Sequence, residues 1–178
     1  MADEMNQMDM GATKRNKWLY VFIGVVVILA IFGLLARRGG FMAMQAAGVN
    51  VQPGPDGAAT YTATDGSGSV TVGGNKLPDT WPSDAPQPFA GATIQYSGSS
   101  NPTTGKAGAA VAYSVQGTSA DVINYYKAQL AGQGWTVEST AAVGATTVLS
   151  AKKGDRTFGV SITDQGNGNI QVTSGLGL

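Results

Sequence analysis

The residue types that most often carry out chemistry in proteins are sparse in this chain of 178 residues. It has no Cys and no His. These absences exclude disulfides, thiolate nucleophiles and zinc–thiolate sites, together with the imidazole that most enzymes use as a general base. Lys plus Arg and Asp plus Glu number 11 each, so no net charge attracts the chain to nucleic acid. We expect no enzyme activity, no cofactor and no nucleic acid partner.

Two short motifs have the spacing of known chemical sites but lack a required residue or context. Gly105 and Lys106 resemble the end of a phosphate-binding loop, but Ala107 follows where that motif needs a hydroxyl. Ser150 and Lys153 have the spacing of a Ser–Lys nucleophile pair, which must lie on one turn of a helix. On a strand, positions three apart face opposite sides. We interpret both motifs as parts of loops or strands.

Acidic residues do not assemble into a convincing metal or hydrolytic site. Residues 164–169 alternate oxygen-bearing side chains with glycines, which favours a hairpin turn over a calcium loop. Glycoside hydrolysis needs two acids that face one cleft. Asp79 and Asp84 lie in a proline-rich stretch, and Glu138 alternates with apolar residues, so it is expected to face water. We therefore predict no metal site and no catalytic residues.

Four aromatic residues are the candidate contacts for a ligand or a partner: Trp81, Phe89, Tyr125 and Trp135. Trp81 and Phe89 lie in an extended stretch that contains four prolines. They either fix this stretch to the domain or form an exposed platform. Tyr125 offers a ring for carbohydrate stacking, or for packing at the edge of a helix. The sequence leaves these alternatives open.

Residues 18–36 contain no charged side chain. A helix of this length extends about 28 Å, close to the ~30 Å hydrocarbon core of a bilayer. We predict a signal-anchor here, a transmembrane helix with the lipid bilayer as its partner. A cleaved signal peptide is the alternative, although such apolar segments are usually shorter. The flanking basic residues are Lys14, Arg15, Lys17, Arg37 and Arg38.

Composition divides the chain into five parts. Residues 1–17 are predicted to be a short cytoplasmic tail and residues 18–36 the transmembrane helix. Residues 37–58 are rich in Gly and Pro, which is typical of a flexible tether. Residues 59–91 are predicted to form a β-hairpin and a proline-rich extended segment. Residues 92–178 are predicted to be an α+β ectodomain, so the localisation is a single-pass cell membrane protein with its C-terminal domain outside the cytoplasm.

The pattern in residues 92–178 predicts the order β-β-α-β-β-β-β, an antiparallel sheet with one helix packed on a face. Thr118 and Asp121 have the spacing of a helix cap. A hairpin over residues 60–72 precedes this unit. Because one amphipathic helix covers one face, we expect the other face to be solvated, or covered by the hairpin and the proline-rich stretch.

Several features occur in the order found in one group of bacterial proteins. After the hairpin come residues 77–86 (Leu-Pro-Asp-Thr-Trp-Pro-Ser-Asp-Ala-Pro), Gly91-Ala92, Tyr125-Tyr126 and Gly134-Trp135. Over roughly residues 60–165 the chain resembles uncharacterised bacterial envelope proteins, membrane-anchored or lipidated, with small helix-on-sheet ectodomains. The resemblance implies location and fold but no catalytic residues. The chain lacks the Cys of the lipidated members.

These observations favour a domain that binds rather than reacts. We expect a membrane-anchored domain of the bacterial cell envelope with a non-enzymatic interaction or structural role, whose partner is an envelope protein or a cell-wall polymer. The alternative is a ligand-binding or sensory module that recognises a cell-wall or small-molecule ligand through the exposed face of its sheet.

Overall fold

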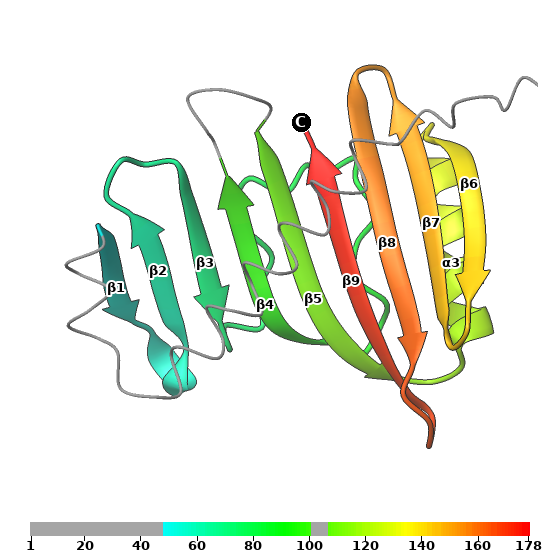
Figure 1. Ribbon diagram of the computed structural model, residues 1–178, viewed down its shortest axis with the longest axis horizontal. Coiled ribbons are helices and arrows are strands. Elements are labelled where there is room, and N and C mark those ends of the chain that lie inside the picture. The colour runs from blue at the N-terminus through cyan, green and yellow to red at the C-terminus, as the bar shows by residue number, and fades with distance from the viewer. Residues whose placement is uncertain (1–47, 101–106) are drawn as a thin grey trace, which may run out of the picture.

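A computed structural model describes residues 48–100 and 107–178, and these form one antiparallel sheet of nine strands with an α-helix on one side (Figure 1). The strand order is β1-β2-β3-β4-β5-β9-β8-β7-β6. The last strand of the chain, β9, therefore lies inside the sheet between β5 and β8. The elements are β1 (Val49–Pro53), the 3-10 helix η1 (Pro55–Gly57), β2 (Ala59–Ala63), β3 (Gly68–Val72), β4 (Thr93–Ser100), β5 (Gly108–Gln116), α3 (Ser119–Gly132), β6 (Thr136–Val143), β7 (Thr146–Lys153), β8 (Arg156–Asp164) and β9 (Asn169–Gly177).

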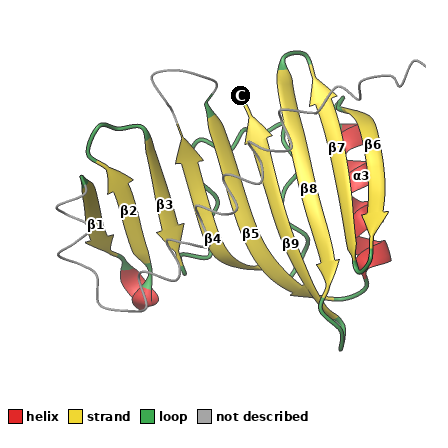
Figure 2. Ribbon diagram, viewed as in Figure 1, coloured by secondary structure: helices red, strands yellow, loops and turns green. Residues whose placement is uncertain are grey.

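The sheet has two different faces, which we call the helix face and the open face. The helix face is the side toward α3, which lies behind β6 and β7 in Figure 2. Alternate residues of β5, β8 and β9 point to this face, since side chains alternate along a strand. They form the core, and their apolar burial supplies most of the folding free energy. Its largest fully buried members include Tyr113, Val111, Phe158, Val160, Ile162, Ile170 and Val172.

The helix α3 begins and ends at the expected signals. The side chain of Thr118 accepts a hydrogen bond from the Asp121 backbone N–H at 3.1 Å, which confirms the predicted N-cap. At the other end, the Trp135 N–H donates to the Leu130 carbonyl at 2.8 Å and the Gly134 N–H donates to the Ala131 carbonyl. Gly134 has φ +75°, a conformation that glycine adopts without strain, so the helix ends in a Schellman motif.

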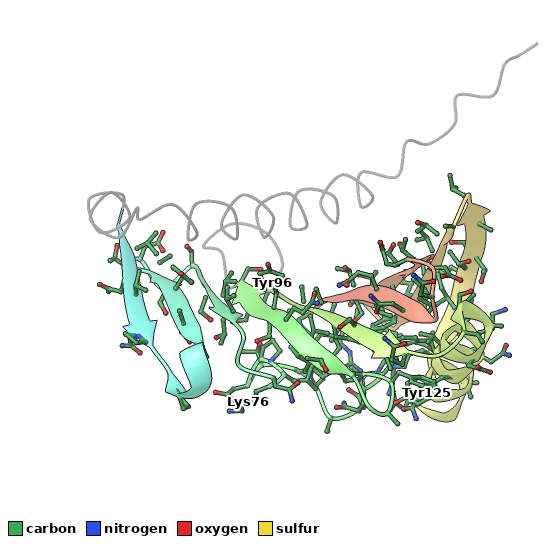
Figure 3. The ribbon with its side chains drawn as sticks, turned by 90° about the horizontal axis from the view of Figure 1, so that it is seen from below. Lys76, Tyr96 and Tyr125 are labelled. Carbon is green, nitrogen blue, oxygen red and sulfur yellow. The ribbon has the colours of Figure 1, made fainter. Side chains whose placement is uncertain are left out.

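The proline-rich segment, residues 73–92, lies on the helix face beside α3. The Phe89 backbone N–H donates to the Tyr113 hydroxyl at 3.2 Å, and the Tyr125 hydroxyl donates to the Pro88 carbonyl at 3.1 Å. In Figure 3, Lys76 and Tyr125 lie on one side of the sheet and Tyr96 lies on the other. The segment and the helix thus cover the same face, and the expectation that the segment covers the opposite face is wrong.

Two parts of the expected fold class are wrong: the hairpin is not a separate unit, and the sheet has more strands than expected. The predicted hairpin, β2 and β3, is not a separate unit, because β3 pairs with β4 and continues the same sheet. A further strand, β1, occupies part of the range expected to be a tether and pairs with β2. Pairing partners depend on contacts between distant residues, which local alternation does not specify. The result is one nine-stranded sheet in place of a hairpin followed by a six-stranded sheet.

No helix within residues 48–100 and 107–178 combines the length and the apolar character needed to cross a bilayer. The expected fold class, which begins with a transmembrane helix, is therefore corrected to a mostly antiparallel sheet with one short helix. Residues 18–36, to which that helix was assigned, lie outside the described residues, as do the expected cytoplasmic tail and Lys106.

Candidate functional site

A β-bulge in β4 creates the most distinctive local geometry of the open face. The register between β4 and β5 shifts between Ile94 and Tyr96, so Gln95 is an extra residue. A bulge re-aims the side chains that follow it. Ile94 is buried in the core, whereas Tyr96 pairs with Ala112 on the open face. In a regular strand these two side chains would point to the same face.

A groove of about 550 Å³ lies beside this bulge, between the end of β3 and the start of β4. The groove is shallow and largely open to solvent, unlike clefts that enclose most of a ligand. Asn75 is one of its lining residues, and the Asn75 Oδ1 accepts a hydrogen bond from the Ile94 N–H at 2.9 Å. None of the lining residues carries a charge. They are Val72, Gly73, Asn75, Thr93, Ile94, Gln95 and Tyr96.

Uncharged polar side chains continue from the groove across the open face. Gln171 Nε2 donates to Gln95 Oε1 at 3.2 Å, and Gln95 Nε2 donates to Ser114 Oγ at 3.5 Å, a long hydrogen bond. The same row continues through Thr163, paired with Gln171, to Thr146, whose hydroxyl lies 2.9 Å from that of Thr163. We call Gln95, Ser114, Gln171, Thr163 and Thr146 the polar row.

The polar row can bind but offers no group that could react. Its amides and hydroxyls both donate and accept hydrogen bonds, which suits a ligand rich in hydroxyl or amide groups. None of its side chains titrates near neutral pH, and the chain has no His or Cys to activate a hydroxyl. The arrangement of Gln95 could not be found from sequence, because the bulge depends on how β4 pairs with β5.

The four aromatic residues predicted as contacts all lie on the helix face or its border. Trp81 is 9% exposed and Trp135 is 4% exposed, and both belong to the core. Phe89 and Tyr125 are partly buried, with their rings in an edge-to-face contact at 5.1 Å between centroids. The structure thus brings Phe89 and Tyr125 together and places Trp135 against Phe158, at 6.1 Å. A ligand contact at any of the four stays a prediction.

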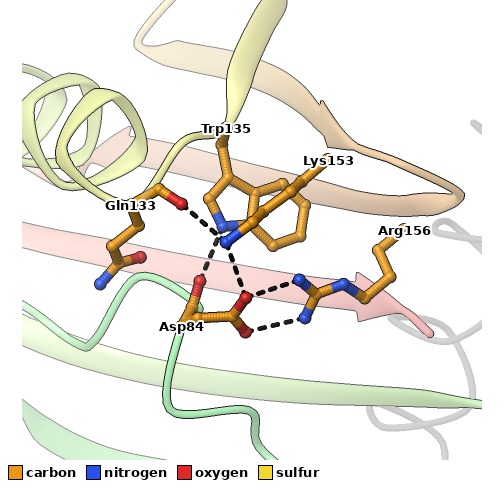
Figure 4. Close-up of polar contacts among 5 residues, drawn as sticks. All are labelled: Asp84, Gln133, Trp135, Lys153 and Arg156. Atoms are coloured by element: carbon orange, nitrogen blue, oxygen red, sulfur yellow. Dashed lines mark hydrogen bonds and ion pairs between the residues drawn. The ribbon is translucent and has the colours of Figure 1, made fainter.

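Asp84 is the centre of a polar cluster that joins three parts of the chain (Figure 4). Both carboxylate oxygens accept from the Arg156 guanidinium, at 2.8 and 2.6 Å, and Oδ2 also accepts from Lys153 Nζ at 2.7 Å. Lys153 donates to the Gln133 carbonyl at the end of α3, and the Trp135 indole N–H donates to the Asp84 carbonyl. The cluster therefore fixes the proline-rich segment to the end of α3 and to the β7–β8 hairpin.

The charge balance of this cluster gives it a structural role. The Arg156 and Lys153 hydrogen bonds hold the pKa of Asp84 well below its usual range, so the carboxylate stays ionised and is a poor base. The same contact raises the pKa of Arg156. The sequence pattern placed Lys153 on a loop or strand and did not connect it with Asp84. The two residues lie 69 positions apart, so no local signal connects them.

The Ser150–Lys153 pair and residues 164–169 do not form the sites that their spacing resembles. Ser150 Oγ is 2.7 Å from Ser139 Oγ on the open face, whereas Lys153 is on the helix face with Asp84. At the β8–β9 turn, the Gly166 N–H donates to Asp164 Oδ1 at 2.8 Å. No group of three or more acidic residues that could hold a metal ion occurs in the described part of the chain.

Comparison with known proteins gives one partial similarity. A family model described as START domain-like matches residues 94–169, from β4 to the start of β9. No curated protein and no solved structure matches the chain. The expected transmembrane signal-anchor is corrected, because no spanning helix occurs in the described residues and the match is to a START domain-like model. The expected location in the cell envelope stays a prediction.

Proposed function

We propose that this chain is a non-enzymatic binding domain that holds a neutral, hydroxyl-rich ligand on the open face of its sheet. The observation that carries the proposal is the pair of hydrogen-bonded amides, Gln95 and Gln171, beside an uncharged groove of about 550 Å³. Amide and hydroxyl side chains bind sugars and related ligands through paired donors and acceptors. The ring of Tyr96, at the groove, offers a flat surface for stacking.

The chemistry of the site favours a neutral ligand over a charged one. Neither the groove nor the polar row has a Lys, Arg, Asp or Glu that would pair with an ionic group. The glycan strands of a cell-wall polymer, the ligand class expected from the sequence, are rich in hydroxyl and amide groups. The START domain-like match includes Gln95 and Tyr96 and supports a ligand-binding domain.

A second candidate function, binding of a protein partner, is favoured by β6. This edge strand is exposed along its whole length, and Val143 is 74% exposed. An exposed edge strand presents unpaired backbone groups to which a partner can add a strand. This role corresponds to the expected interaction with an envelope protein.

Titration calorimetry with neutral oligosaccharides tests the first function. We expect chitotetraose or cellotetraose to bind the full-length chain, and Gln95→Ala and Gln171→Ala each to weaken binding by about tenfold, near 1.4 kcal/mol. Gln129→Ala removes a comparable amide on α3, far from the groove, and is expected to bind like the parent chain. Absence of binding to every neutral oligosaccharide, or equal losses in Gln129→Ala, would contradict the proposal.

A further inference from the structure

The polar row crosses five consecutive strands in register. Ser114 of β5 pairs with Gln171 of β9, and Gln171 pairs with Thr163 of β8. Thr163 in turn pairs with Thr146 of β7. Gln95 joins the row from the bulge of β4, where its amide bonds both Ser114 and Gln171. Because directly paired residues point to the same face of a sheet, the row is a line of hydrogen-bonding groups that runs across the strands.

The row has the length of several linked sugars. Neighbouring strands lie ~4.8 Å apart, so the spacings from β4 through β5, β9 and β8 to β7 add up to about 19 Å. A β-1,4-linked pyranose chain is extended, and each of its sugars advances by about one strand spacing. Each strand of the row can therefore contact one sugar of such a chain.

A second row of the open face runs beside the polar row and is less polar. Tyr96 pairs with Ala112 of β5, and this row continues through Thr173 and Ser161 to Val148 of β7. Sugars have polar edges and apolar faces, and an aromatic ring packs well on such a face. A sugar chain between the two rows would thus have hydrogen-bonding groups along one edge and the ring of Tyr96 at its groove end.

The open form of the groove favours an extended ligand over a compact one. Sites for compact ligands enclose most of the ligand surface, whereas this groove is shallow, and the polar row leads out of it toward β7. An extended chain gains affinity by adding contacts along its length. Neither the groove nor the row carries a charged side chain, so both suit a neutral chain.

We infer that the polar row is a linear series of subsites for an extended β-1,4-linked oligosaccharide, with the first sugar at Tyr96 and the last at Thr146. This inference rests on the proposed function, because it specifies the shape and the length of the neutral ligand. Glycans of the cellulose type and of the chitin type share this linkage, and the second type adds an N-acetyl amide to its sugars.

Titration calorimetry of the full-length chain with oligosaccharides of increasing length tests the series of subsites. We expect the affinity to rise with each sugar up to the pentaose and then to level off, with cellopentaose at least about tenfold tighter than cellobiose. Such a rise in either the cello- or the chito-oligosaccharides supports the inference, and the tighter series identifies the source. Equal affinity for the disaccharide and the pentaose would overturn the inference alone, whereas no binding in either series would contradict the proposed function as well.

Maltopentaose is the matched control ligand for chain shape. It has the same glucose units as cellopentaose, but its α-1,4 links curve the chain. We expect it to bind at least about tenfold more weakly than cellopentaose, because a curved chain contacts only part of the row. Equal affinities would overturn the inference, since the open face would then bind hydroxyl groups whatever the shape of the chain.

A variant at the far end of the row separates long ligands from short ones. Thr146→Val removes the last hydroxyl but keeps the shape of the side chain. It is expected to weaken cellopentaose by about fivefold and to leave cellotriose, which would reach only β9, unchanged. Gln95→Ala is expected to weaken both. Thr62→Val makes the same replacement on the helix face of β2 and is expected to change neither affinity. If Thr146→Val changed the two affinities equally, or changed neither, the inference would be overturned.

Discussion

The two faces of the sheet use neighbouring residues of the same strands in opposite ways. On β8, Phe158, Val160 and Ile162 point to the helix face and are at most 1% exposed. Ser161, which lies between two of them, and Thr163, which follows Ile162, point to the open face and are half-buried. The helix face is filled by large apolar side chains under α3, whereas the open face has small or uncharged polar ones. Stability is therefore concentrated on the helix face, so the side chains of the open face can serve binding at little cost in stability.

Two tyrosine hydroxyls of the helix face are paired with each other in the core. The Tyr113 and Tyr126 hydroxyls lie 2.8 Å apart in the core, and Tyr113 also accepts from the Phe89 N–H. Burial raises the pKa of both tyrosines, Tyr126 most strongly, so both stay neutral at physiological pH. On the open face, the hydroxyls and amides of the polar row can exchange their partners for those of a ligand.

Removing a large side chain from the helix face is expected to give the largest effect. Phe158→Ala leaves a cavity against Tyr126 and Trp135, and we expect a loss of about 3–5 kcal/mol in the free energy of unfolding. Val148→Ala on the open face of β7 is expected to lose about 1 kcal/mol or less. Urea denaturation measures both values. Similar losses of unfolding free energy in the two variants would contradict the claim that stability is concentrated on the helix face.

Removing one hydroxyl from each face sharpens the comparison on a single strand. Tyr113→Phe leaves the Phe89 N–H and the Tyr126 hydroxyl without a buried partner, and the expected loss is about 1–3 kcal/mol. Ser114→Ala, at the next position of β5, removes a hydroxyl from the open face and is expected to change stability by less than about 0.5 kcal/mol. Thermal unfolding of the two variants measures the difference. An equal fall in their unfolding midpoints would contradict this expectation.

The ion pairs of Asp84 are expected to contribute less than the core, because the side chain is 41% exposed and water screens its charge. Asp84→Asn should lose about 1 kcal/mol or less at neutral pH. The pKa of Asp84 is depressed in the folded protein, so its stabilisation is complete above the ordinary value of 3.8 and declines as the pH falls below it.

Denaturant titrations at several pH values between 2 and 7 measure this dependence. The parent chain is expected to lose more stability on acidification than Asp84→Asn does. Asp79→Asn is the control, since its pair with Lys76 is almost fully exposed and should contribute nothing measurable. An acid dependence that Asp84→Asn retains in full would exclude this cluster as its source.

The smallest effect on stability is expected where the effect on binding is large. Gln171→Ala should change the free energy of unfolding by less than about 0.5 kcal/mol, because its side chain lies on the half-buried open face. The same change is expected to weaken oligosaccharide binding by about tenfold. Calorimetry measures the affinity and urea denaturation the stability. A variant that loses both together would show that the open face also maintains the fold.

Local signals in the sequence predicted the elements around α3 well. Thr118 is the cap, and the apolar stripe of Val122, Tyr126 and Leu130 is the buried face of the helix. Gly134 ends it with a positive φ, which glycine adopts without strain. These features depend on residues within one or two turns of each other, and such contacts are encoded in spacing.

Features that depend on distant pairing could not be predicted in the same way. The strand β1 lacks a strong alternation and is held by its register with β2. The bulge at Gln95 arises from the pairing of β4 with β5, and the contact of Asp84 with Arg156 joins residues 72 positions apart. The groove depends on the bulge, so the sequence did not indicate the candidate site. The aromatic residues that it did indicate belong mostly to the core.

The place of β9 has a consequence for how the chain is made. Because β9 is synthesised after β5 and β8 but lies between them, the sheet exists as two unjoined halves until β9 is complete. Until then β5 and β8 each present an open edge, on which a nascent chain is prone to pair wrongly. Premature termination before Asn169 would thus release a single chain whose two sheet halves have no strand to join them, rather than a slightly shortened domain.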